Sequence, residues 1–195
     1  MLNDSLFYEF HEIIGGEKIM SPAPNIKHGG IVVSLIATIG NYVKKNKLGY
    51  VFADHTDVKL PDGNTLSPDF IFISLENEFL VSKNLKGAIR GVPDFVVEIF
   101  SKSTMKRDLT VKKDIYELNG VKEYWLIDPW KESITVYLLR DGKFEFDEEY
   151  IYYNQDEWEE LTDEQRAEAK LEVKVSTIEG LSVKLSDIFD WLIRD

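Results

Sequence analysis

The chain has 195 residues, of which 44% are hydrophobic and 12% aromatic, and it contains no cysteine. This length and composition predict one globular domain over residues 1–195, and they exclude a disordered chain, a disulfide-stabilised scaffold and a thiolate metal site. The formal net charge is −12, which argues against tight nonspecific binding to a polyanion.

The negative charge is concentrated in one segment. Glu145 to Glu172 contains 12 acidic and 2 basic residues, so this segment carries −10 and the rest of the chain only −2. A nucleic acid could therefore dock elsewhere. The segment itself could be an interaction surface, a mimic of DNA or a solvated face, and a solvated face is the commonest meaning of such a run.

No targeting or membrane segment is predicted. The N-terminus lacks a basic stretch followed by an apolar run. The longest apolar stretch, Ile31 to Ile39, is far shorter than the roughly 18 residues that a membrane span requires. We therefore expect a soluble, cytoplasmic protein.

The chain begins with a predicted hairpin and a helix. Two short apolar pieces, Phe10 to Ile14 and Lys18 to Met20, are separated by a glycine pair, which is a hairpin signal. From about His28 to Lys45, apolar residues recur on one helical face and lysines gather near the C-terminal end, where cations are favoured. Gly49 is expected to end this helix.

Two strands and a tight turn follow. Tyr50 to Leu60 reads as a strand with Phe52, Asp54, Thr56, Val58 and Leu60 on one side. Residues 61–64, Pro-Asp-Gly-Asn, are a strong turn signal. Phe70 to Ile73 is a short apolar strand that comes directly after Asp69.

The centre of the chain predicts a strand, a helix and a second strand. Phe95 to Phe100 is mostly β-branched and aromatic, which suits a buried strand. A helix from about Thr104 to Asn119 follows, and Gly120 can supply its left-handed stop. Val121 to Ile127 returns as a strand, so the unit predicts a crossover onto a sheet, right-handed if the two strands are parallel.

The C-terminal third predicts further strands and short helices. Ser133 to Leu139 and Lys143 to Tyr153 form a hairpin around an Asp-Gly turn. A capping box begins a short solvated helix over Thr162 to Lys170. Leu181 to Leu192 closes the chain with a small strand and a helix.

Two carboxylates are expected to meet on neighbouring strands. If Asp69 to Ile73 and Asp94 to Phe100 pair antiparallel, the start of the first strand lies across from the end of the second, so Asp69 faces Glu98. Asp94 points to the same face as Glu98, but it lies about 13 Å away along an extended strand, so these two cannot share one ion.

Converging carboxylates repel each other unless a cation lies between them. A site of oxygen ligands suits Mg²⁺ or Mn²⁺, which retain waters and accept phosphate oxygens. Asp69 and Glu98 are therefore the candidate metal ligands, and the backbone carbonyl of Ile99 could complete the set.

Lys112 is the third candidate residue. It lies four residues after Asp108 and four before Tyr116 on the predicted helix, and its ammonium could hold an attacking water or the scissile phosphate. The alternative is an intrahelical ion pair with Asp108 that has no catalytic role. Asp108, Tyr116, Asp94 and His28 are secondary candidates; for His28, in the first turn of its helix, the alternative is a capping or hydrogen-bonding role.

A long motif runs through this part of the chain. It comprises Pro93-Asp94, Glu98, Ser101, Ser103-Thr104, Asp108, Lys112, Tyr116, Gly120-Val121, Glu123-Tyr124-Trp125 and Asp128-Pro129. The motif resembles the signature of the Uma-type putative restriction endonuclease family, within the PD-(D/E)XK nuclease superfamily. Ser67-Pro68-Asp69 is similar to the family's upstream acidic strand, and residues 180–189 are similar to its C-terminal close, so the resemblance covers most of the chain.

The resemblance implies a restriction-endonuclease-like α/β fold, a mixed sheet flanked by helices with the core order αβββαβ. An N-terminal hairpin and a C-terminal β extension would be added to it. The implied activity is divalent-metal-dependent hydrolysis of DNA phosphodiester bonds, with Mg²⁺ or Mn²⁺ held by Asp69 and Glu98 and with Lys112 stabilising the developing charge.

One residue departs from the superfamily pattern. Phe100 stands two residues after Glu98, where the usual lysine would be, and the resemblance implies that this role has moved to Lys112. The rival interpretation is a catalytically silent nuclease fold that acts as a binding or assembly module. Cleavage of RNA or of nucleotides is a further alternative, because a fold does not fix a substrate. A homodimer is also plausible, since cleavage of two strands ordinarily needs two active sites.

Overall fold

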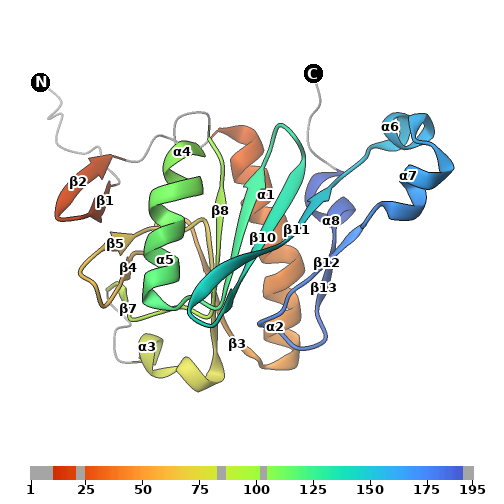
Figure 1. Ribbon diagram of the computed structural model, residues 1–195. Helices are drawn as coiled ribbons and strands as arrows, with labels where there is room; N and C mark the ends of the chain where they lie inside the picture. The colour runs from red at the N-terminus through yellow and green to blue at the C-terminus, as the bar shows by residue number, and fades with distance from the viewer. Residues whose placement is uncertain (1–10, 21–24, 83–86, 102–104, 191–195) are drawn as a thin grey trace, which may run out of the picture.

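A six-stranded mixed sheet forms the centre of the computed structural model, which describes residues 11–20, 25–82, 87–101 and 105–190 (Figure 1). The strand order is β11-β10-β9-β8-β6-β3. The strands are β3 (Gly49–Ala53), β6 (Phe70–Ser74), β8 (Phe95–Ile99), β9 (Glu123–Asp128), β10 (Ser133–Arg140) and β11 (Lys143–Ile151). Only the β8–β9 pair is parallel among the described strands of this sheet.

The central strand–helix–strand unit is confirmed. After β8 the chain forms one helical run, made of α4 (Met105–Arg107), the π-helical turn η4 (Asp108–Lys112) and α5 (Lys113–Asn119). Gly120, with φ of 87°, ends the run in the left-handed conformation that a glycine adopts without steric cost. The parallel β8–β9 pairing makes the unit a crossover.

The first long helix comprises α1 (Ile26–Leu35), the π-helical turn η2 (Ile36–Gly40) and α2 (Asn41–Asn46). Asn25 caps it by accepting a hydrogen bond from the N–H of His28 at 2.9 Å. The predicted end at Gly49 is wrong, because Lys47 adopts the left-handed conformation with φ of 54° and Gly49 already belongs to β3.

This helix is longer than its apolar run indicated. Ile26–Asn46 spans 21 residues with a hydropathy of 1.2, so among the described residues one helix is long and apolar enough to cross a membrane by length and composition. A core helix passes the same test. Here Ile31, Leu35 and Ile39 are fully buried in the core of the fold.

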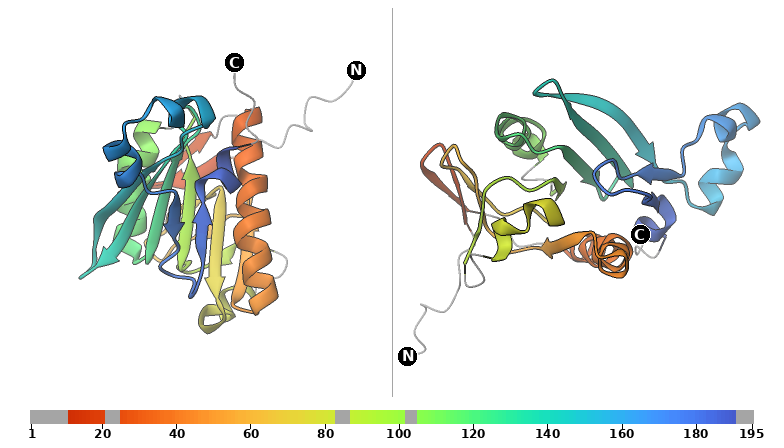
Figure 2. Two further views of the ribbon diagram at one scale, coloured as in Figure 1. Left: turned by 90° about the vertical axis from the view of Figure 1, so that its right-hand side faces the viewer. Right: turned by 90° about the horizontal axis from the view of Figure 1, so that it is seen from below.

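Two apolar layers cover the two faces of the sheet. Phe70 and Phe72 alternate with Ile71 and Ile73 along β6, so the first pair packs in the core with α1 and the second pair in the core on the other face. That second core includes residues of α5, and the views in Figure 2 show the two helices on opposite sides of the sheet. Each fully buried side chain of this size contributes roughly 1.5–3 kcal/mol.

A second, smaller sheet of five strands lies beside α5 in Figure 1, in the order β2-β1-β5-β4-β7. Its strands are β1 (His11–Ile14), β2 (Glu17–Met20), β4 (Val58–Lys59), β5 (Thr65–Leu66) and β7 (Ile89–Arg90). The predicted hairpin around the glycine pair is confirmed, and residues 1–10 lie outside the described part of the chain.

The predicted strand from Tyr50 to Leu60 is wrong beyond Ala53. The chain turns at Asp54 and His55, where His55 has φ of 67°, and then enters the small sheet as β4. Residues 54–57, Asp-His-Thr-Asp, are all polar, so the alternation stops at the turn where the chain changes sheet. The break places Asp54 at the end of β3, next to the start of β6.

The remaining elements are at the edges of the fold. The turn η3 (Leu75–Asn77) and the helix α3 (Phe79–Ser82) follow β6, and β12 (Glu172–Lys174), β13 (Ser182–Lys184) and α8 (Leu185–Phe189) close the chain. Two short helices with capping boxes, α6 (Gln155–Glu160) and the predicted α7 (Asp163–Glu168), project from one end of the molecule in Figure 1. The restriction-endonuclease-like order αβββαβ is thus present as α1–α2, β3, β6, β8, α4–α5 and β9.

Candidate functional site

The predicted antiparallel pairing of the two strands is confirmed, and it places Asp69 and Glu98 at paired strand ends; that they bind one ion stays a prediction. The antiparallel register joins Phe70 to Val97, which brings Asp69, one residue earlier, opposite Glu98. The N–H of Asp69 donates to the carbonyl of Val97 at 3.1 Å, and the N–H of Ile99 donates to Asp69 Oδ2 at 2.5 Å. Burial raises the pKa of Glu98, and the charges of Asp108 and Asp69 add to this shift.

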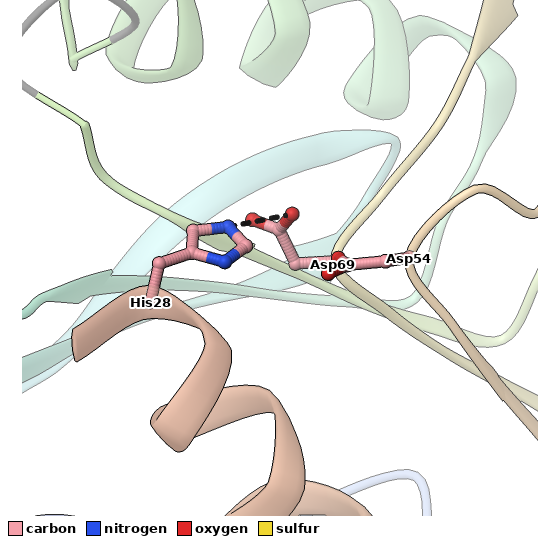
Figure 3. A group of neighbouring side chains, drawn as sticks. All are labelled: His28, Asp54 and Asp69. Atoms are coloured by element: carbon pink, nitrogen blue, oxygen red, sulfur yellow. Dashed lines mark ion pairs between the residues drawn. The ribbon is translucent and has the colours of Figure 1, made fainter. Parts of the chain in front are cut away.

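Two residues from other elements, His28 and Asp54, lie beside Asp69. His28 reaches it from the first turn of α1, with Nε2 at 3.0 Å from Asp69 Oδ1. Asp54 approaches from the turn after β3, as Figure 3 shows. One ligand atom from each of His28, Asp54 and Asp69 lies within 4.8 Å of the others, close enough together to hold a metal ion. Glu98, the predicted partner of Asp69 in the metal site, does not belong to this group of described residues.

The environment of this group shifts two pKa values. Burial, together with the negative charge of Asp69, raises the pKa of Asp54 to about 7. Burial alone would lower the pKa of His28, but its hydrogen bond to Asp69 and the charge of that carboxylate outweigh burial, so the pKa is raised. The histidine therefore favours the charged form beside its carboxylate, and a bound cation would compete with that proton.

Glu98 has its own set of partners on the α5 side of the sheet. Lys112 Nζ lies 2.9 Å from Oε2, and the hydroxyl of Tyr116 donates to Oε1 at 2.7 Å. Glu98 is only 3% exposed. Burial raises its pKa well above the ordinary value, although the charge of Lys112 opposes this shift.

Lys112 is buried among carboxylates and does not point into bulk solvent. Its Nζ lies 2.8 Å from Glu12, 2.9 Å from Glu98 and 3.7 Å from Asp108. The intrahelical pair with Asp108, the alternative in the sequence, is thus the longest of these three contacts. Burial would lower the pKa of Lys112, but the charges of Glu98, Glu12 and Asp108 outweigh burial and raise it.

Sequence reasoning missed Glu12, Asp54 and Arg107. Glu12 lies on β1, is 1% exposed and contacts both Lys112 and Arg107. A lone carboxylate in an apolar hairpin strand is the same signal that singled out Glu98. Asp54 could not be found in this way, because it was assigned to the interior of a strand.

Asp94 does not join this group. It accepts hydrogen bonds from Ser74 N–H at 2.8 Å, from Asn77 at 3.0 Å and from Lys122 at 2.6 Å, at the far ends of β6 and β8. Burial would raise its pKa, but these hydrogen bonds outweigh burial and lower it. A cavity of about 730 Å³ lies beside Asp94 and Lys122, at this opposite end of the strands.

The remaining secondary candidates contact the site indirectly. The backbone carbonyl of Asp108 accepts a hydrogen bond from Tyr124 at 3.0 Å, and the Asp108 side chain is buried beside Lys112. Ile99 donates its backbone N–H to Asp69, and the metal-binding role of its carbonyl stays a prediction. Phe100 packs in the apolar layer on the α5 side and is 6% exposed.

Comparisons with known proteins indicate a family and a fold. A family model described as Uma2, putative restriction endonuclease, matches residues 7–174. A crystal structure of a putative nuclease belonging to DUF820 from Anabaena variabilis is similar over 94% of this chain and 91% of that one, with a TM-score of 0.69 and 21% sequence identity. At that identity the likeness concerns the fold alone. No curated protein matches the chain.

Proposed function

Because the chain belongs to the Uma2 family of putative restriction endonucleases, we propose that it is a divalent-metal-dependent endonuclease that hydrolyses DNA phosphodiester bonds. One observation carries this proposal. A group of side chains that suits a cation, around Asp69, lies at the strand position opposite Glu98, whose buried carboxylate binds the amine of Lys112.

The charges of the described residues at these strand ends favour a divalent ion. Five carboxyl groups face two permanent cations, Lys112 and Arg107, and one histidine. The carboxyl groups are those of Glu12, Asp54, Asp69, Glu98 and Asp108. Carboxylate oxygens suit both Mg²⁺ and Mn²⁺, and an imidazole ligand would favour Mn²⁺, because it is a transition metal.

We assign Asp69 as the central ligand. His28 and Asp54 would bind the ion from the α1 side, and Glu98 with the backbone carbonyl of Ile99 would bind it from β8. Glu98 accepts one hydrogen bond on each oxygen, and since a carboxylate oxygen has two lone pairs, it retains the capacity to bind a metal. The bound ion would supply an activated water and stabilise charge on the phosphate.

The role proposed for Lys112 follows from its protonation. Its pKa is raised by the neighbouring carboxylates, so the side chain stays an ammonium at neutral pH and cannot serve as a general base. It can instead stabilise negative charge that develops on the phosphate, or orient the attacking water. Tyr116 would hold Glu98 in place through its hydroxyl.

A plasmid nicking assay with Mg²⁺ or Mn²⁺ tests the proposal. We expect Asp69→Asn and Glu98→Gln each to lower the nicking rate by about 10²–10³-fold, as loss of a group that stabilises the transition state does. Glu117→Gln is the matched control, because Glu117 binds Lys143 at 2.7 Å on the outside of α5. Unchanged nicking in both site variants would refute the assignment.

The buried Phe100 at the usual lysine position supports a second candidate function, a silent nuclease fold that binds a partner without cleavage. Calorimetric titration with Mn²⁺ separates the two. The endonuclease requires metal binding that Asp69→Asn and His28→Ala weaken, whereas a silent module needs no such site. Parallel assays on single-stranded DNA and RNA would define the substrate.

A further inference from the structure

Glu12 is a buried carboxylate in an unexpected place. It lies on β1, a strand of four residues in the N-terminal hairpin, and it is 1% exposed. Burial of an unpaired carboxylate is costly, so a short hairpin retains one only where charged or polar partners compensate. Its partners come from the two elements that carry the proposed active site.

Those partners are a lysine, a backbone amide and an arginine. Lys112 Nζ lies 2.8 Å from Glu12 Oε1, and the N–H of Ser67 donates to the same oxygen at 3.1 Å. Arg107 lies 3.5 Å from Oε2. Ser67 is two residues before Asp69, so Glu12 connects the segment that carries Asp69 with the helix that carries Lys112.

The contact restricts the orientation of the amine. An ammonium has three N–H donors on a flexible four-carbon stem. Two of its close partners are Glu98 on the large sheet and Glu12 on the small sheet, at nearly equal distances of 2.9 and 2.8 Å. Asp108 lies farther away, at 3.7 Å. With two donors directed to fixed carboxylates, the third has a defined direction and can be presented to a phosphate oxygen.

We propose that Glu12 is a positioning residue of the active site, which holds the Lys112 ammonium in its reactive orientation and makes the N-terminal hairpin part of the catalytic machinery. This proposal rests on the proposed role of Lys112. Glu12 acts through Lys112 and does not itself touch the substrate.

The first experiment compares Glu12→Gln with Glu117→Gln in nicking of supercoiled plasmid with Mn²⁺. Glu117 is a matched control because it also binds a lysine, Lys143, and a backbone N–H, that of Phe144. We expect Glu12→Gln to lower kcat by about 10²-fold, the effect of a misplaced catalytic group, with KM for DNA nearly unchanged. Equal kcat values for the two variants would overturn the proposal.

A double-mutant cycle separates positioning from a general structural effect. In a Lys112→Met background, Glu12→Gln should change the residual rate by less than about threefold, because residues that act through one another are not additive. A full 10²-fold loss in that background would show that Glu12 acts independently of Lys112 and would contradict the proposal. If Glu12→Gln does not fold, Glu12→Asp, which keeps the charge, takes its place in the cycle.

A readout without catalysis distinguishes this inference from the proposed function. The ¹H–¹⁵N signal of the Lys112 ammonium, assigned by its loss in Lys112→Met, reports whether the amine is held in hydrogen bonds. We expect it to shift or broaden in Glu12→Gln and to stay in place in Glu117→Gln. An unmoved signal overturns the positioning role even if the wild type cleaves DNA. If the signal moves but the protein has no nuclease activity, the contact between Glu12 and Lys112 is supported and the proposed function is refuted.

Discussion

Asp94 and Glu98 lie four residues apart and both are buried, yet their surroundings give them different roles. Asp94 accepts hydrogen bonds from an amide N–H, an asparagine and a lysine that together satisfy its charge. Glu98 shares its lysine with a second buried carboxylate, Glu12. The first arrangement stabilises the fold, whereas the second leaves negative charge that a metal ion could neutralise.

Asp94 should therefore affect stability and its dependence on pH. We expect Asp94→Ala to lower the free energy of unfolding by about 1.5–3 kcal/mol at pH 7, the range for hydrogen bonds to a charged group. Because the folded-state pKa is lowered from its usual 3.8, this contribution is complete above about pH 4 and is lost as the pH falls through the folded-state value. Urea unfolding of the variant and the wild type from pH 7 to pH 2.5 measures it. Exposed Asp114→Asn is the control, and a difference that persists at the lowest pH would contradict the assignment.

The sequence predicted some helices, strands and turns correctly and others incorrectly. The hairpin glycines, the Gly120 stop and the capping box of Thr162 act locally, so their signals are complete within a few residues. After the break at Ala53, β4 pairs with β5 across the turn at residues 61–64 and with the distant strand β7, and no local pattern contains the second pairing. For the same reason Asp69 and Glu98 could be paired from strand order, whereas Asp54 and Glu12 could not.

Gly49 illustrates an element boundary that tertiary packing decides. It begins β3 with φ of 155°, and a Cβ there would lie 2.1 Å from the carbonyl oxygen of Ile73 on β6. We expect Gly49→Ala to shift the edge strand and to lower the free energy of unfolding by about 1–3 kcal/mol, as overpacking does. Gly29→Ala in α1 meets nothing within 4 Å and should stabilise the helix by about 0.5–1 kcal/mol. Thermal unfolding of the two variants gives the comparison, and a Gly49→Ala protein as stable as the wild type would contradict the predicted clash.

At the scale of the whole molecule, the net negative charge is distributed unevenly. Residues 145–172, the acidic segment, carry −10 and the rest of the chain carries −2. The acidic segment forms β11, α6, α7 and the start of β12, and the helices project from the fold in Figure 1. Its acidic residues on α6 and α7 are exposed, so they contribute little to stability but add to the long-range negative potential. A chain of the proposed function would have to approach DNA against this potential.

Removing part of that charge tests whether the potential reaches the DNA. Replacing four exposed glutamates of α6 and α7 by glutamine, at Glu159, Glu160, Glu164 and Glu168, changes the formal net charge from −12 to −8. We expect the variant to bind duplex DNA a few-fold more tightly at low ionic strength. The gain should fade as salt rises, because the Debye length falls from about 30 Å at 0.01 M to about 10 Å at 0.1 M.

The fold should be unaffected by these four changes, since exposed substitutions usually alter stability by less than about 0.5 kcal/mol. Fluorescence anisotropy with a labelled duplex at 10, 50 and 150 mM salt measures the affinity, and thermal unfolding controls for the fold. Identical affinities at the lowest salt would mean that DNA approaches from a direction the segment does not influence. In that case the segment's charge would have to act on a different partner, and the −2 carried by the rest of the chain would be the charge that DNA meets.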